Sequence, residues 1–204
     1  MAIIMEGRRN HSDHRLLRAM FEARKRVFVD LLRWDVPVLD GRYEIDQFDD
    51  ENAIYVIVTD GEGRHRGSAR LLPTMRPHIL DTLFPQLCAD RPPRGAGIFE
   101  ITRFCLDREQ DATSRLIARN RLVSAMVDYA IDNGIHAFSG VAEVGWLQQI
   151  LAFGWRCSPL GLPRQIGGRM LGALRIEIGE NTPALLSWNK IYAPDMLQGA
   201  LEAA

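Results

Sequence analysis

The sequence has few cysteines, no long apolar run and almost no net charge, and each of these features argues against a class of protein. Its three cysteines, Cys88, Cys105 and Cys157, are far apart and form no C-x-x-C pair. We therefore expect free, mostly buried thiols rather than a disulfide framework or a structural zinc site. A formal net charge of −1 gives no general electrostatic attraction to nucleic acid or to an anionic membrane.

No apolar stretch approaches the roughly 18 residues of a membrane-spanning helix. Ala2–Met5 run directly into the charged Glu6, Arg8 and Arg9, which is not the pattern of an apolar leader. These features predict a cytoplasmic protein with no nucleic-acid or membrane partner. No metal site is expected either, because only His11 and His14 have ligand spacing, and that pair is more simply a solvated helix start. The 204 residues predict one globular domain over 1–204.

Residues 98–104 read Ile-Phe-Glu-Ile-Thr-Arg-Phe, a composition typical of a β-strand. An apolar strand should not bury Glu100 and Arg103 unless each has a partner, because unpaired burial of charge is costly. The alternative is an amphipathic strand with Glu100 and Thr102 facing water. A regular strand sends Glu100 and Arg103 to opposite faces, so a shared site requires the strand to end or bulge between them.

Other charged residues occupy apolar surroundings in a similar way. Arg24 lies on the helical apolar stripe between Met20 and Phe28, so it points toward the core or extends along its stem to solvent. Arg70 lies in an apolar strand. Five carboxylates fall between residues 44 and 51, as a solvated loop or as partners for these arginines. Asp46 and Asp49 are spaced to share one side of a turn, where they could hold a cationic ligand group or fix arginines.

The order of expected elements is that of an α/β protein with a mixed sheet. A helix, a hairpin, a short helix and the central strand are followed by a long helix and by alternating strands and helices. The expected ranges are 12–33, 53–59 with 67–72, 78–88, 98–104, 112–132, 135–142, 144–152, 155–158, 169–178 and a last helix from Thr182. Ser12 or Asp13 would cap the first helix, whose apolar stripe includes Leu31. Leu116 and Ile117 belong to the expected buried stripe of the long helix, which Gly134 would end.

Four motifs occur along the first half of the chain. They are Arg24-x3-Phe28-x5-Trp34, Asp46-Gln47-Phe48-Asp49, Arg70-Leu71-Leu72-Pro73-Thr74 with Phe84-Pro85, and Glu100-Ile101-Thr102-Arg103-Phe104. Together they resemble the LuxI-type acyl-homoserine lactone synthases, which make autoinducers for quorum sensing. The resemblance covers roughly residues 20 to 105 and weakens to about residue 178. It implies a single GNAT-like α/β domain with a mixed, mostly antiparallel sheet splayed at its centre and helices on both faces.

The resemblance implies acylation of the amine of S-adenosylmethionine by an acyl thioester, then lactone closure with release of methylthioadenosine. Adenosylmethionine is a substrate, and no cofactor is implied. Glu100 would accept the ammonium proton, with Arg103 as the other catalytic residue. Arg24, Asp46, Asp49 and Arg70 would form the polar network of the adenosylmethionine pocket with Arg103, and Phe28, Trp34 and Phe84 would form its apolar walls. Ser139, Val141 and Ala142 would line the acyl-chain pocket.

The sequence departs from the family pattern at three places. Phe99 stands where tryptophan is frequent. Gly140-Val141-Ala142 lacks the threonine of many members that use 3-oxoacyl chains, and the nearest hydroxyl is Ser139, which favours a chain without a 3-oxo group. Residues 144–152 are less basic than in members that dock an acidic acyl carrier protein. Arg108, Arg115, Arg119 and Arg121 could supply that surface instead, or the donor is an acyl-CoA.

Two other functions are compatible with this architecture. A GNAT-type N-acyltransferase usually has a glycine-rich pyrophosphate loop after the central strand, but residues 107–112 contain no glycine. A non-catalytic sensor of adenosylmethionine would not need Glu100.

Overall fold

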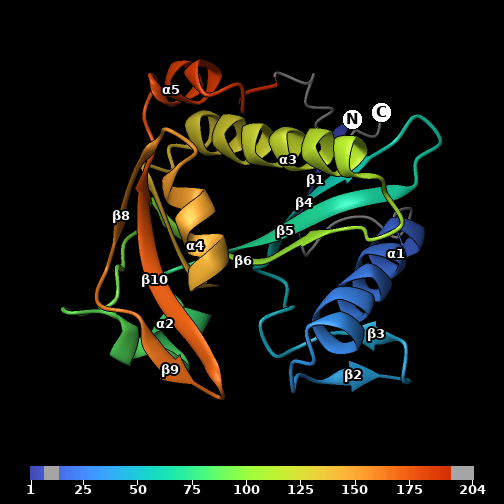
Figure 1. Cartoon of the computed structure of the whole chain (residues 1–204), viewed down its shortest axis with the longest axis horizontal. Coiled ribbons are helices and arrows are strands. Elements are labelled where there is room, and N and C mark those ends of the chain that lie inside the picture. The colour runs from blue at the N-terminus through green and yellow to red at the C-terminus, as the bar shows by residue number, and fades with distance from the viewer. Residues whose placement is uncertain (7–13, 194–204) are drawn as a thin grey trace. The chain divides into compact units, whose positions relative to one another are not determined.

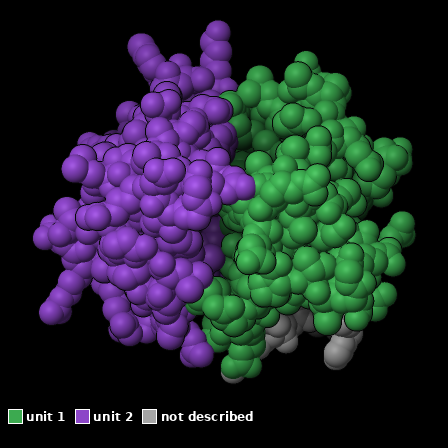
Figure 2. All heavy atoms as spheres, turned by 60° about the horizontal axis from the view of Figure 1, so that its bottom comes forward, with its two compact units in different colours: residues 1–70, 103–125, 194–204 green, residues 71–102, 126–193 purple. Residues whose placement is uncertain are grey.

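The computed structural model describes residues 1–6 and 14–193, which form two compact units (Figures 1 and 2). Unit 1 contains residues 1–70 and 103–125, and unit 2 contains residues 71–102 and 126–193. The chain passes between the units within two strands and one long helix. The division into two units leaves the single domain over 1–204 a prediction.

Unit 1 is built on strands in the order β1-β4-β5-β6, with β1 antiparallel to β4 from Ala2↔Val58 to Glu6↔Ile54. Helix α1 packs against the short strand β3. The elements are β1 (Ala2–Glu6), α1 (His14–Arg24), the π-helical segment η2 (Lys25–Leu31), β2 (Val38–Leu39), β3 (Tyr43–Glu44), β4 (Ile54–Thr59), and parts of β5 (His65–Pro73), β6 (Ile98–Leu106) and α3 (Ala112–Asp132).

Unit 2 has the strand order β6-β7-β10-β8, and β9 also pairs with β10. Strand β7 is parallel to β6 and antiparallel to β10, whereas β8 and β9 are antiparallel to β10. Helix α4 packs on β7 and β10 (Figure 1). The further elements are α2 (Ile79–Thr82), η3 (Pro85–Leu87), β7 (Ala137–Glu143), α4 (Val144–Leu151), β8 (Arg156–Pro159), β9 (Arg164–Ile166), β10 (Arg169–Glu177) and α5 (Thr182–Trp188).

These elements confirm the predicted α/β class with a mixed, mostly antiparallel sheet. The long helix occupies the expected residues 112–132, although Leu116 and Ile117 are half exposed instead of buried. The first helix becomes π-helical after Arg24, and Leu31 is exposed rather than part of the buried stripe. The predicted capping residues Ser12 and Asp13 and the side chains of His11 and His14 lie outside the described residues.

Strands β1, β2, β3 and β9 were not predicted, and β2, β3 and β9 have only two or three residues each, too few to show a periodic pattern. The β2–β3 connection nevertheless has a recognisable sequence: Asp40 and Gly41 both have positive φ, at 51° and 64°. An Asp-Gly pair in this conformation joins the two strands tightly. The turn directs β3 back toward α1, and so places Glu44 where it can meet Arg24.

Three thiols are free, and Cys105 is buried. Among the residues that the structure describes, no helix combines the length and the apolar character that crossing a bilayer demands. Within the same part of the chain, no group of three histidine, cysteine, aspartate or glutamate side chains is arranged to hold a metal ion.

Unit 1 buries a histidine whose protonation opposes folding. His65 begins β5, and its Nε2 lies 3.0 Å from Ser68 Oγ. Burial lowers the pKa of His65 to about 4, although the charge of Asp107 acts in the opposite direction. Arg26 and Arg66 also lower this pKa.

We therefore expect the protein to lose stability as the pH falls from 6.5 toward 4. The unfolded chain binds a proton at His65 near pH 6.5, whereas the folded chain does so only near its lower pKa. The loss attributable to His65 is about 3 kcal/mol across this interval. Urea denaturation of the wild type and of His65→Gln at several pH values measures it, with the exposed His136→Gln as control. An equal pH slope in all three proteins would contradict the assignment.

Candidate functional site

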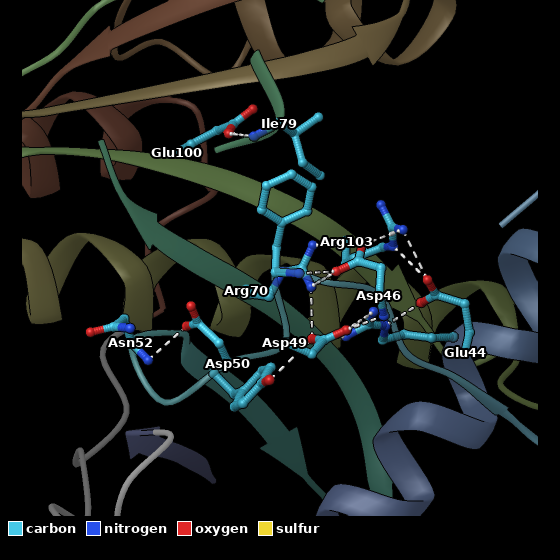
Figure 3. A network of polar contacts seen from close by, with 12 residues as sticks. Glu44, Asp46, Asp49, Asp50, Asn52, Arg70, Ile79, Glu100 and Arg103 are labelled. Atoms are coloured by element: carbon cyan, nitrogen blue, oxygen red, sulfur yellow. Dashed lines mark hydrogen bonds and ion pairs between the residues drawn. The ribbon is translucent and has the colours of Figure 1, made fainter. Parts of the chain in front are cut away.

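Unit 1 contains a closed ring of alternating guanidinium and carboxylate groups (Figure 3). Arg24 donates to Glu44 across 2.5 Å and to Asp49 across 2.8 Å. Arg70 pairs with Asp46 at 2.6 Å and with Asp49 at 2.7 Å. Arg103 completes the ring through Glu44 at 2.9 Å and Asp46 at 2.7 Å. Each member therefore pairs with two neighbours of opposite charge.

The ring unites five residues that the sequence predicted to converge: Arg24, Asp46, Asp49, Arg70 and Arg103. The alternatives of a solvent-exposed Arg24 and a fully solvated acidic loop are wrong, because the side chains of Arg24 and Asp49 are each only 1% exposed. Asp46 and Asp49 share a turn, in which the Asp46 N–H donates to Asp49 Oδ2 across 2.9 Å. Of the two roles considered for this pair, fixing arginines is the one observed.

In the ring, burial and the neighbouring charges shift the pKa values in opposite directions. Burial by itself raises the pKa of Asp49, but hydrogen bonds from Arg24 and the charges of Arg24 and Arg70 outweigh it and hold the pKa below its usual range. Burial lowers the pKa of Arg24, and the paired carboxylates raise it further than burial lowers it. The ring pairs three guanidinium groups with three carboxylates, so its formal charges cancel. A neutral ring of this kind is costly to break at any one member.

One edge of the ring is less buried than the rest. The side chains of Arg103 and Asp46 are 9% and 6% exposed, against 0–1% for the other four members. The guanidinium of Arg103 also lies 5.6 Å from the ring centroid of Phe28 and 6.0 Å from that of Trp34. Phe28 and Trp34 stack directly on each other at 4.7 Å, which leaves no room for a further ring between them.

Strand β6 carries both central charged residues, but they belong to different units. Glu100 lies in unit 2, is fully buried, and accepts backbone N–H bonds from Ile79 at 2.8 Å and Leu80 at 3.0 Å, at the start of α2. Figure 3 shows the Glu100 carboxylate directed at the Ile79 nitrogen. The alternative in which Glu100 and Thr102 face water is wrong, since both are buried.

The predicted irregularity of β6 is found at Arg103, whose φ is +50°. Buried positions alternate at Ile98, Glu100 and Thr102 and then resume at Cys105, so the alternation shifts by one residue here. A left-handed non-glycine residue inside a strand is rare and costs free energy, so other contacts have to hold it.

The remaining predicted residues lie in unit 2. Phe84 and Val141 pack against an apolar cluster of Leu80, Leu87 and Ala173. Phe84 thus shares the surroundings of a predicted acyl-pocket residue. Ala142 is partly buried and pairs with Gly172 of β10.

Ser139 stands beside Glu100 in the parallel register of β6 and β7, so their side chains leave the same face of the sheet. It is fully buried, and no hydrogen-bond partner for its hydroxyl is found among the described residues. Burial and the nearby charge of Glu100 both raise the pKa of the Cys88 thiol, which joins the edge of the apolar cluster. Carboxylate, hydroxyl and apolar surface are therefore neighbours in this unit.

Two residues of the site, Glu44 and Tyr55, were not predicted from the sequence. Glu44 was one of five carboxylates within the eight residues 44–51, yet it is the fully buried bridge between Arg24 and Arg103. Its separation of two residues from Asp46 was the available signal, because such residues share a face in extended chain. Tyr55 donates its hydroxyl to Asp49 Oδ1 across 3.0 Å, and burial and that carboxylate raise the pKa of Tyr55.

Unit 1 also has a pocket of about 310 Å³ between β4, β5, the loop after β6 and the start of α3. Its lining mixes Asp60, Glu109 and Asp111 with Arg66 and Arg121. Arg66 already pairs with Asp60 at 2.8 Å. Two of these carboxylates, Glu109 and Asp111, lie at the position of a pyrophosphate loop and do not suit a phosphate group, which agrees with the absence of glycine there.

Comparison with known proteins identifies the family. The model described as Autoinducer synthase matches residues 8–184. An acyl-homoserine-lactone synthase of Ralstonia nicotianae is 36% identical over 174 residues, covering 82% of this chain and 85% of that protein. A crystal structure described as the CoA-dependent acyl-homoserine lactone synthase BjaI with SAM and isopentyl-CoA has a TM-score of 0.88 and 27% identity, covering 100% of this chain and 95% of that one.

A putative N-acetyltransferase from Lactobacillus plantarum is similar in fold alone. It has a TM-score of 0.58 and 13% identity, and the match covers 88% of this chain and 98% of that one. This likeness and the synthase structure together confirm the GNAT-like fold. With motif residues gathered in the ring and a family match along most of the chain, this protein belongs to the autoinducer synthase family.

Proposed function

We propose that this protein is an acyl-homoserine-lactone synthase that makes a quorum-sensing signal from S-adenosylmethionine and an acyl thioester. The observation that carries the proposal is the ring, in which five motif residues of the family converge. The activity is acyl transfer followed by an intramolecular displacement.

In the first step the ammonium group of adenosylmethionine loses a proton, and Glu100 is the acceptor, through one water. The neutral amine attacks the thioester carbonyl, the C–S bond breaks, and the thiol leaves with a proton. An amide is formed. In the second step the carboxylate of the methionine part attacks the carbon of its own side chain that is bonded to the sulfonium sulfur. That C–S bond breaks, its electron pair neutralises the sulfonium, and methylthioadenosine leaves as the lactone closes.

The ring contributes rigidity and orientation. Because its charges cancel, the ring offers no free charge in its interior, and among the ring members only Arg103 and Asp46, at the less buried edge beside Phe28 and Trp34, are assigned to contact substrate. Folding the substrate into a near-attack shape supplies much of the acceleration of lactone closure, since effective molarities of about 10⁵ to 10⁸ M are reached in such reactions.

The acyl chain is assigned to unit 2, where Val141, Phe84 and Cys88 line the cluster around Leu80 next to Glu100. An apolar chain fits such surroundings. The donor is either an acyl-CoA or an acyl carrier protein. The first ten residues of α3 include Arg115, Arg119 and Arg121 and no acid, although Glu109 and Asp111 lie just before the helix. Since both substrates are metabolites of the cytoplasm, we place the reaction there.

Mass spectrometry of spent medium from cells expressing the protein tests this proposal. We expect an acyl-homoserine lactone, absent from cells with the empty vector, and the mass gives the acyl chain and its oxidation at C3. Purified protein assayed with acyl-CoA and with acyl carrier protein then identifies the donor. No lactone in either assay, with adenosylmethionine binding retained, would contradict synthesis and favour a sensor.

A further inference from the structure

The left-handed backbone of Arg103 requires a cause. L-residues rarely adopt a φ near +50°, and a long side chain inside a strand gains nothing locally from it. The conformation is therefore imposed by what the side chain or its surroundings contact.

The contacts of the Arg103 side chain point to Glu44. Its Nε and Nη2 both donate to Glu44 Oε1, across 3.1 and 2.9 Å. The other oxygen of Glu44 accepts from Arg24 Nε across 2.5 Å, and Arg24 is itself held by Asp49. Glu44 is fully buried, whereas Asp46, the second partner of Arg103, lies at the less buried edge of the ring. Glu44 is thus the fixed end of the pair.

We propose that Glu44 is a positioning residue: its carboxylate holds Arg103 in the left-handed conformation and keeps the guanidinium at the ring edge beside Phe28 and Trp34. The consequence for the reaction rests on the proposed function, in which this edge contacts adenosylmethionine. The structural part, a link between the Glu44 carboxylate and the backbone of residue 103, stands independently of it.

A comparison of Arg103→Gly with Arg103→Ala tests the structural part. Both variants lose the side chain and its pair with Glu44. If that pair imposes the positive φ, residue 103 relaxes toward a regular strand, and the alanine variant melts at the same temperature as the glycine variant or higher. If instead the rest of the fold imposes the positive φ, glycine tolerates this conformation better than alanine. Arg103→Gly then melts about 2–4 °C higher than Arg103→Ala, which would overturn the proposal.

The functional part is tested with two matched ring variants, Glu44→Gln and Asp49→Asn. Each replaces a buried carboxylate by its neutral isostere, and Asp49 serves as control because it pairs with Arg24 and Arg70. Both should melt lower than the wild type. We expect Glu44→Gln to lower kcat/KM for adenosylmethionine on the order of 10²-fold, because small displacements of positioning groups have effects of this size.

Double variants separate positioning from general destabilisation. In a protein that already has Arg103→Ala, adding Glu44→Gln should lower kcat/KM little further, whereas adding Asp49→Asn should multiply the loss. Glu44→Asp, which keeps the charge, should recover part of the activity of Glu44→Gln. If both changes lowered kcat/KM by the same further factor in the Arg103→Ala protein, Glu44 would contribute to stability alone, and the proposal would be contradicted. If the wild type makes no lactone, the proposed function fails, and the Gly/Ala comparison still decides the link between Glu44 and residue 103.

Discussion

Replacing Glu100 by glutamine should slow lactone synthesis by at least ~10²-fold, the usual scale for a positioned proton acceptor. Glutamine has nearly the same shape but does not accept a proton at neutral pH. Adenosylmethionine affinity, measured by isothermal titration calorimetry, should change by only a few fold, so the loss should appear in kcat. Full activity in Glu100→Gln would remove the assignment of Glu100 as base.

This variant needs a control because Glu100 has a second role in the fold. Its carboxylate accepts the N–H groups of Ile79 and Leu80, and an amide can satisfy these donors only in part. Asp81→Asn disturbs the same end of α2, since Asp81 accepts the His78 N–H across 2.8 Å. We expect both variants to melt lower, with turnover lost only in Glu100→Gln. An equal loss of turnover in Asp81→Asn would attribute the effect to the helix start.

Arg24→Ala should destabilise the protein by about 3–5 kcal/mol, the scale for removing one partner from a buried ion pair. The change removes from both Glu44 and Asp49 a cation that is itself only 1% exposed, and it gives the ring a net negative charge. For a chain of this size the melting temperature should fall by roughly 6–20 °C. Scanning calorimetry and urea denaturation measure the loss, and lactone synthesis should fall with it.

Arg42→Ala is the matched control for this measurement. Arg42 pairs with Glu22 at 2.8 Å, but its side chain is 65% exposed. An exposed pair contributes only about 0–1 kcal/mol, so the melting temperature should hardly change. If Arg24→Ala behaved like Arg42→Ala, the ring would not be a source of stability.

Added salt should change the stability effects of Arg24→Ala and Arg42→Ala by different amounts. Exposed charges are screened within about 10 Å at 0.1 M ionic strength, whereas buried charges are screened much less. The small effect of Arg42→Ala should disappear at high salt, and that of Arg24→Ala should remain.

The local sequence pattern was sufficient to predict part of this structure. The helical spacing of Met20, Arg24 and Phe28 placed an arginine on a buried stripe, and the side chain is indeed buried. The long helix 112–132 was predicted to the residue, because its apolar periodicity and the following Gly134 define both length and end. The motifs also carried the family resemblance, and with it the fold and the activity.

The pairing of charges was decided only by tertiary structure. Sequence gives an excess of possible partners, five carboxylates and three arginines, and distances in the chain do not select among them. Glu44 became the central bridge because the Asp40–Gly41 turn returns β3 toward α1, which is a long-range consequence of one tight turn.

By itself the sequence determined the main helices and strands, the presence of charged residues on apolar faces, and the resemblance to the family, because periodicity and motifs are local properties. Only the tertiary structure decided that three arginines and three carboxylates close into a neutral ring, that Glu100 is held by the first N–H groups of α2, and that Arg103 is left-handed. The physical reason is that a buried charge must be paired, while the partner that pairs with it is chosen by the path of the folded chain.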